Sequence, residues 1–255
     1  MKVLNQHIAP MYIWAIALLL AIAAISGYTL RTVPYALIAA AASAAALDLL
    51  LSVLVLKHKP RIPFSGIITG LIIGSVAPVN APLMLVLLAS LIAVASKLFL
   101  KYKSVNILNP AALGLVVALA AFGMGDAWWA ASSYNVYGIA VSLTPILIIL
   151  AYQARRLTTA AAFVIVGIAA SLALGGTLSL IGIASAILGF NYLFAFVMLV
   201  DPKTSPNHRL MQIAYGAAVA LIGTAATLLA APYPLLVALI VGNLGYMAYR
   251  KAGRR

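Results

Sequence analysis

Few side chains in this sequence are of a type that carries chemistry. The chain has three acidic residues and no cysteine, which excludes a thiolate metal site, a cysteine-ligated iron-sulfur cluster and a cysteine nucleophile. Among the acids, Asp48 alone lies inside a long apolar run, where a carboxylate is costly to bury and is therefore a candidate for an ion pathway. The structural alternative is an aspartate that is neutral or hydrogen-bonded against a neighbouring helix, or one turned toward Lys57 and Lys59 through water.

Three short polar clusters stand at the ends of apolar runs: Ser65–Gly70, Asn106–Pro110 and Asp201–Pro206. Serine and threonine in the first cluster can cap a helix, and the amide groups at a helix N-terminus can hold an anion. Asn109 is a good N-cap, and Pro110 fits the first helical turn. Taken one at a time, each cluster is typical of a helix cap or a turn. The residues that could shape a polar site are Ser65, Gly66, Thr69, Gly70, Asn109, Pro110, Asp201, Pro202, Thr204 and Ser205.

The elements that must position these residues are membrane-spanning helices. The chain is 65% hydrophobic and 7% charged, whereas ordinary soluble domains are roughly 25% charged, so its solvent must be lipid. Backbone groups in lipid have to bond within their own segment, and each span needs about 20 apolar residues. The predicted spans lie near residues 11–29, 34–56, 64–77, 82–98, 107–124, 137–153, 158–174, 178–200, 210–230 and 235–250. We therefore expect an all-α polytopic membrane protein of about ten transmembrane helices.

Basic residues alternate with these spans in a way that predicts topology. If the spans cross in turn, fifteen of the sixteen lysines and arginines fall on one side, and only Arg31 falls on the other. The positive-inside rule places the basic side, with both termini, in the cytoplasm of a cell-membrane protein. The net charge of +13 then marks orientation in the bilayer, and we expect no nucleic-acid partner.

The third predicted span is too short to cross comfortably. Pro63 and Pro78 bound it, and it contains three glycines, so it is expected to be broken or re-entrant. Two groups of five spans would run in opposite directions, because five is odd. The prediction is a single integral membrane domain, 1–255, made of two inverted halves, 1–130 and 131–255.

Taken together, the clusters resemble the family that contains the D subunit of the Rnf electron-transport complex and the B subunit of the sodium-pumping NADH:quinone oxidoreductase. The resemblance covers roughly residues 61–250. Ser65 with Thr69-Gly70 and Pro78 looks like one family pattern, and Asn109-Pro110-Ala111-Ala112 resembles the family's asparagine-proline-alanine helix start. The aromatic stretch 190–196, leading into Asp201–Pro206, is similar to its most recognisable signature. Tyr233-Pro234 with Asn243 resembles the family's pattern more weakly.

This resemblance implies a membrane subunit of an ion-translocating, flavin-linked electron-transport complex, on a fold similar to urea transporters. Family members commonly carry FMN on a threonine in a serine-glycine-alanine-threonine loop, but no such motif occurs here. The comparable loop, Gly123–Val136, contains no threonine. We therefore expect noncovalent FMN or riboflavin and assign no attachment residue. We interpret Trp128 and Trp129 in that loop as interfacial anchors rather than as flavin-stacking residues.

The sequence lacks the motifs of a complete redox enzyme, and two alternatives to a redox subunit remain. The sequence has no Gly-rich nucleotide fingerprint, so other subunits would have to carry the flavin, iron-sulfur or nicotinamide sites. No nucleophile, base and orienting group occur together, so a self-contained enzyme is not expected. A stand-alone channel or carrier for a small solute or ion is the main alternative, and a structural anchor for redox subunits is another.

Overall fold

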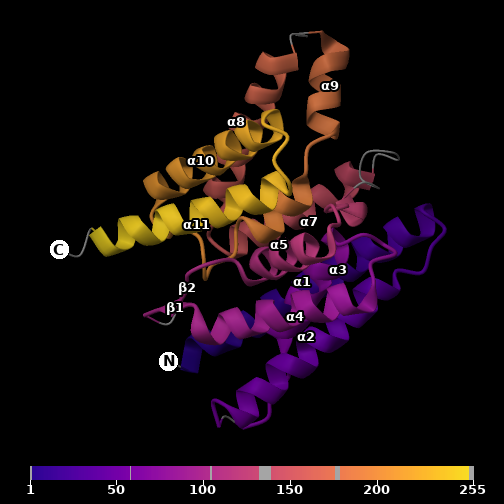
Figure 1. Cartoon of the computed structure of the whole chain (residues 1–255). Helices are drawn as coiled ribbons and strands as arrows, with labels where there is room; N and C mark the ends of the chain where they lie inside the picture. Colours follow the sequence, from indigo (N-terminus) through magenta and orange to yellow (C-terminus); the bar gives the residue numbers. More distant parts are fainter. Residues whose placement is uncertain (1, 58, 104, 132–138, 176–178, 253–255) are drawn as a thin grey trace. The chain divides into compact units, whose positions relative to one another are not determined.

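The computed structural model describes residues 2–57, 59–103, 105–131, 139–175 and 179–252, and most of them are helical (Figure 1). Among these residues, two short strands, β1 (Lys101–Tyr102) and β2 (Val105–Asn106), pair as a two-stranded sheet. Within the described ranges, three helices are long and apolar enough to cross a membrane: α2 (Tyr35–Leu54), α8 (Leu157–Gly175) and α10 (Arg209–Leu228). The predicted helical fold, with apolar helices suited to a membrane, is thus confirmed.

The chain forms two compact units. Unit 1 comprises residues 1–101 and 110–133, and unit 2 comprises residues 102–109 and 134–255. Besides α2, unit 1 contains α1 (Lys2–Thr29), α3 (Phe64–Val76), α4 (Leu83–Phe99) and α5 (Pro110–Phe122). Besides α8 and α10, unit 2 contains α7 (Ile139–Gln153), α9 (Leu180–Leu188), the π-helical segment η1 (Phe194–Met198) and α11 (Pro234–Ala252).

Helix α3 is buried within unit 1. It has 13 residues, which at 1.5 Å per residue is about 20 Å and too short for a bilayer core of about 30 Å. It packs against α1, α2, α4 and α5, and three glycines bring it close to α2. A Cβ atom added to Gly66 would lie 2.7 Å from the carbonyl oxygen of Ala44, and Gly70 and Gly74 meet the backbone of Ala40 and Leu37 in the same way. The short helix therefore lies in protein rather than in lipid, as an interrupted segment requires.

The predicted span 178–200 differs from the structure, which breaks it. Helix α9 ends at Leu188, and a second helical segment starts at Tyr192 and continues into η1. The side-chain Oδ1 of Asn191 accepts a hydrogen bond of 2.9 Å from the amide of Phe194, so Asn191 caps the second segment. An apolar run of about 20 residues looks continuous in hydropathy, and the break is visible only in Gly189 and Asn191.

Unit 2 is closely packed around α10, whereas the side chains of α9 are exposed or half-buried. Near its start, α8 packs against α10, where Gly216 lies against the carbonyl oxygen of Thr159. Helix α10 also packs against α11 through Gly242, which meets the side chain of Val219. By contrast, none of the side chains of α9 is buried, and Leu180 is 86% exposed. The core of unit 2 therefore lies around α10.

Candidate functional site

The first turn of α3 forms a polar site in unit 1. The ammonium group of Lys97 on α4 donates hydrogen bonds to the backbone oxygen of Ser65 at 3.0 Å and to its hydroxyl at 3.1 Å. The hydroxyl of Thr69 donates to the same backbone oxygen at 2.8 Å. Lys97 is only 8% exposed and Thr69 only 6%. A buried ammonium group is thereby held against the start of a short, buried helix.

Asp48 lies beside this turn. It is half-buried on α2, and a Cβ atom added to Gly66 would lie 2.7 Å from the Asp48 Cβ. Gly66 thus lets the backbone of α3 approach the aspartate. Among the residues that the structure describes, no hydrogen bond or ion pair reaches the Asp48 carboxylate. Its assignment to an ion pathway remains a prediction, and it now has specific neighbours: Gly66 on α3 and, one residue away, the serine that binds Lys97.

Sequence reasoning missed Lys97, although a signal for it was present. The residue lies inside the predicted span 82–98, and a lysine within a span is a functional candidate for the same reason as Asp48. Grouping it with the basic residues of the following loop concealed this. The structure places five predicted residues at or beside the start of α3, namely Asp48, Ser65, Gly66, Thr69 and Gly70.

A second polar site in unit 2 centres on Asn243 of α11, which is 1% exposed. Its Oδ1 accepts a hydrogen bond of 2.8 Å from the backbone amide of Asn109, and its Nδ2 donates to the Tyr215 hydroxyl at 2.6 Å. The same Nδ2 lies 3.4 Å from the backbone oxygen of Thr204. The Asn109 side chain donates to the Met198 carbonyl at 3.2 Å. The second and third polar clusters, about 90 residues apart, are therefore joined at one buried amide.

Asp201 caps its own turn. Its Oδ1 accepts from the amide of Lys203 at 3.1 Å, and its Oδ2 accepts from the Thr204 hydroxyl at 3.2 Å. The Ser205 hydroxyl donates to the Asp201 backbone oxygen at 2.8 Å. Thr204 and Ser205 are buried, whereas Pro202 is exposed. This geometry matches the turn expected from the cluster taken by itself. Pro110 is the first residue of α5, as predicted.

Arg156, which sequence reasoning did not single out, holds this turn in place. It is 4% exposed, and its guanidinium donates to the Ser205 hydroxyl at 2.9 Å, to the Arg155 carbonyl at 3.1 Å and to the Asn207 side chain. Burial lowers the pKa of Arg156, while Tyr246 and Asp201 act in the opposite direction. Gln212 adds a further link, since its Nε2 donates to the carbonyls of Arg155 at 2.8 Å and of Pro206 at 3.2 Å.

The interpretation of the tryptophan pair as interfacial anchors is wrong for Trp129. This side chain is 4% exposed, and its Nε1 donates to the Gly74 carbonyl at 2.7 Å, near the end of α3. Trp128 donates from Nε1 to the Asp126 carboxylate at 2.6 Å. Trp129 therefore helps to pack α3 within unit 1. The rest of the predicted loop, residues 132–136, lies outside the described residues.

Unit 2 also contains a group of aromatic rings around η1. Phe163 of α8 contacts Phe190 with 5.4 Å and Phe194 with 5.1 Å between ring centroids. Tyr192 lies 5.7 Å from the Phe190 ring and 6.3 Å from that of Phe196. The aromatic stretch that carried the strongest family resemblance thus packs the broken segment α9–η1 onto α8.

Among the described residues, few buried polar side-chain atoms lack a hydrogen-bond partner. Two buried side-chain atoms among them have no hydrogen-bond partner, the hydroxyls of Ser75 on α3 and Thr159 on α8. No group of three or more metal-ligating side chains that could hold an ion occurs within the described ranges. Comparisons of the chain with models of known protein families and with curated proteins gave no match.

Proposed function

We propose that this chain is a membrane component of an ion-translocating, flavin-linked electron-transport complex, of the kind to which the Rnf complex belongs. The observation that carries the proposal is that the Asn109 and Asp201–Pro206 clusters meet at Asn243. The backbone amide of Asn109 and the backbone carbonyl of Thr204 both form hydrogen bonds with the Asn243 side chain. Three separate elements of the resemblance thereby form one buried structure, which independent helix caps would not require. The proposed location is the cell membrane, with both termini in the cytoplasm.

The order of helix packing supports two inverted halves within about ten spans. In unit 1, α4 packs against α2 and α5; in unit 2, α10 packs against α8 and α11. Both α5 and α11 begin at a proline, Pro110 and Pro234. Each also carries a glycine that contacts the preceding long helix, Gly114 against α4 and Gly242 against α10. In the order of the chain, the short α3 comes between α2 and α4, and the broken segment α9–η1 comes between α8 and α10. These two segments therefore correspond to each other in the two units.

The start of α3 supports an ion route through unit 1. An aspartate without a protein partner among the described residues attracts cations, and the neighbouring Ser65 and Thr69 supply oxygen atoms, the ligands that Na⁺ and hydrated protons use. The Lys97 ammonium already occupies the Ser65 oxygens. An entering cation would compete with Lys97 for them, which makes this turn a point of control.

The described residues do not fit a flavin at the Asn243 site. The polar atoms of Asn109, Asn243 and Tyr215 are used in bonds to one another and to the backbone, so they have little capacity left for an isoalloxazine ring. We derive no step through the cofactor. Noncovalent FMN or riboflavin, and partner subunits that carry flavin, iron-sulfur or nicotinamide sites, belong to the proposal by resemblance. The second candidate, a stand-alone channel or carrier, needs no flavin site.

A visible absorption spectrum tests the proposal. We expect the chain, purified gently from its own membranes with its associated subunits, to show flavin bands that disappear from the chain on denaturation. Flavin fluorescence retained in a denaturing gel would contradict noncovalent binding. A colourless preparation that passes small solutes across proteoliposomes by itself would contradict the redox role and support the channel.

The ion route is tested on the same complex. Asp48→Asn keeps the side-chain size but removes the charge. We expect it to lower the rate of ion transport at least tenfold, which corresponds to an increase of about 1.4 kcal/mol or more in the activation free energy. Asp126→Asn, at the acid that binds Trp128, is the matched control. Equal transport in both variants would exclude Asp48 from the route.

A further inference from the structure

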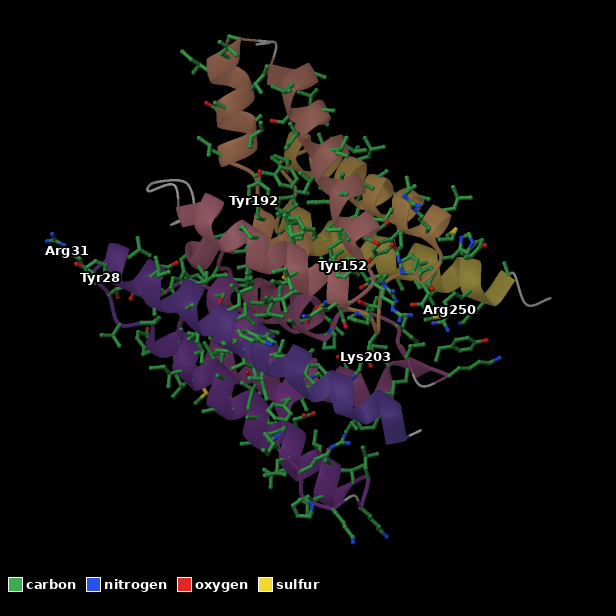
Figure 2. All side chains as sticks on the ribbon, turned by 180° about the vertical axis from the view of Figure 1, so that it is seen from behind. Tyr28, Arg31, Tyr152, Tyr192, Lys203 and Arg250 are labelled. Atoms are coloured by element: carbon green, nitrogen blue, oxygen red, sulfur yellow. The ribbon has the colours of Figure 1, made fainter. Side chains whose placement is uncertain are left out.

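Unit 2 is strongly basic, and three of its cations, Lys103, Arg250 and Lys251, lie beside tyrosine rings near the end of α11. Within the ranges of unit 2 the sequence has nine lysines and arginines and one acid, Asp201. The Asp201 carboxylate is bonded within its own turn. Blue nitrogen atoms cluster around the labelled Arg250 in Figure 2. This end of unit 2 therefore has a large excess of positive charge.

Tyrosine rings hold three of these cations in place. The ammonium of Lys103 lies 5.6 Å from the centroid of the Tyr102 ring, and that of Lys251 lies 5.5 Å from the same centroid. The guanidinium of Arg250 lies 5.7 Å from the centroid of Tyr246. A ring attracts each cation, but two ammonium groups on one ring repel each other. An anion near this ring would be attracted by both charges and would weaken that repulsion.

The surface next to these cations is apolar and exposed. Val241, Leu244, Ala248 and Lys251 of α11 are spaced by three, four and three residues, so they lie on one face of the helix. Val241 is 43% exposed and Leu244 is 50% exposed. From Val241 to Lys251 the helix rises about 15 Å, which equals half of a bilayer core of about 30 Å. The stripe thus has the length of one lipid leaflet and ends at the ammonium group.

We propose that Tyr102, Lys103 and Lys251 form a binding site for the phosphodiester headgroup of an anionic phospholipid, whose acyl chain lies along Val241, Leu244 and Ala248. The charge alone would suit an acidic protein as well. The apolar stripe favours the lipid, because it lies within the predicted span 235–250, and an acyl chain along it brings an anionic headgroup to the level of Lys251. The site is independent of any redox role of the chain.

Lipid binding to the full-length chain, measured by native mass spectrometry in a mild detergent, tests this site. The chain is titrated with phosphatidylglycerol and with phosphatidylcholine, and the ratio of the two dissociation constants is compared between variants. Each lysine near an anionic headgroup contributes about 1 kcal/mol. We therefore expect the double variant Lys103→Gln, Lys251→Gln to lower the preference for phosphatidylglycerol about thirtyfold, equivalent to about 2 kcal/mol.

The matched control removes two other exposed lysines that no ring holds within the described residues, by Lys57→Gln with Lys59→Gln in unit 1. This control should keep the preference. Tyr102→Phe should also keep it, whereas Tyr102→Leu should weaken it, which separates the ring from general folding. An equal loss in both double variants, or none in either, would overturn the site. Glycerol phosphate that competes as well as the lipid would show a free phosphate site instead.

Discussion

Arg156 and Lys97 are buried cations that donate hydrogen bonds to neutral oxygen atoms. Arg156 donates to a serine hydroxyl, an asparagine side chain and backbone carbonyls, and Lys97 donates to the two oxygens of Ser65. Burying a charge costs several kcal/mol unless polar partners replace water. These side chains therefore fix the backbone segments that supply their acceptors, the 205–207 turn for Arg156 and the start of α3 for Lys97.

Replacing Arg156 should destabilise unit 2. Arg156→Met removes the donor to the buried Ser205 hydroxyl, to the Arg155 carbonyl and to the Asn207 side chain, so we expect a loss of about 1 to 3 kcal/mol in the free energy of unfolding. Thermal unfolding in detergent, followed by circular dichroism, measures the change. Arg155→Met is the control, because that neighbouring side chain is more accessible to solvent and should alter stability by less than about 0.5 kcal/mol. Equal melting temperatures for both variants would contradict the role given to Arg156.

At the scale of these residues, the sequence predicted the polar clusters but only part of their bonding. Residue type and position predict Asn109 and Asp201 as caps, because capping is a local interaction. The structure shows this for Asp201, whose carboxylate accepts from the Lys203 amide and the Thr204 hydroxyl. The link from Asn109 to Asn243 spans 134 residues and depends on how α11 packs, which no local pattern contains. Arg156 was hidden for a similar reason: in the sequence it is one more basic residue after a span.

Helix α3 shows how glycine spacing sets the distance between two helices. Its glycines recur every four residues on one face, so the α3 backbone can lie directly against α2. Three such glycines are visible in the sequence and led to the prediction of a broken or re-entrant third span. The structure shows that α3 is short but is one continuous helix, Phe64–Val76. The break in the span 178–200 was not predicted, because α9 and the segment from Tyr192 are both apolar and hydropathy does not register the capping by Asn191.

A methyl group at Gly70 should separate these helices. In Gly70→Ala the new Cβ would lie 2.6 Å from the Cα of Ala41, too close for any ordinary contact, so we expect a loss of about 1 to 3 kcal/mol in stability. Gly245→Ala on α11 is the control, since no atom lies within 4 Å of its added Cβ. Alanine favours a helix by about 0.5 to 1 kcal/mol over glycine. Opposite shifts in melting temperature are therefore expected, and a stable Gly70→Ala variant would show that α2 and α3 are not in close contact.

For the molecule as a whole, the charge pattern and the helix packing bear on two separate predictions, the first on topology and the second on a repeated arrangement of helices. The basic residues predict about ten crossings with both termini in the cytoplasm, and the order of helix contacts in unit 1 resembles that in unit 2. The charge argument rests on basic residues at or near the ends of spans, and the packing argument rests on contacts between helices. Composition could predict a membrane protein because lipid constrains every span alike. It could not predict the division at residues 102–109, where a segment between two helices of unit 1 belongs to unit 2.

Single cysteines can test this topology, since the natural chain has none. Tyr28 is 88% exposed at the end of α1, Lys59 follows α2, and Lys251 lies at the end of α11. If α2 crosses the membrane and the number of spans is even, a cysteine at position 28 faces outward and cysteines at positions 59 and 251 face the cytoplasm. A membrane-impermeant maleimide should then label Tyr28→Cys in intact cells, and Lys59→Cys and Lys251→Cys only in inverted vesicles.

Labelling of positions 28 and 59 from the same side would mean that α2 does not cross. Labelling of positions 59 and 251 from opposite sides would mean that one helix between them lies within the membrane without crossing it, and α3 would be the first to examine, because at about 20 Å it is shorter than the bilayer core.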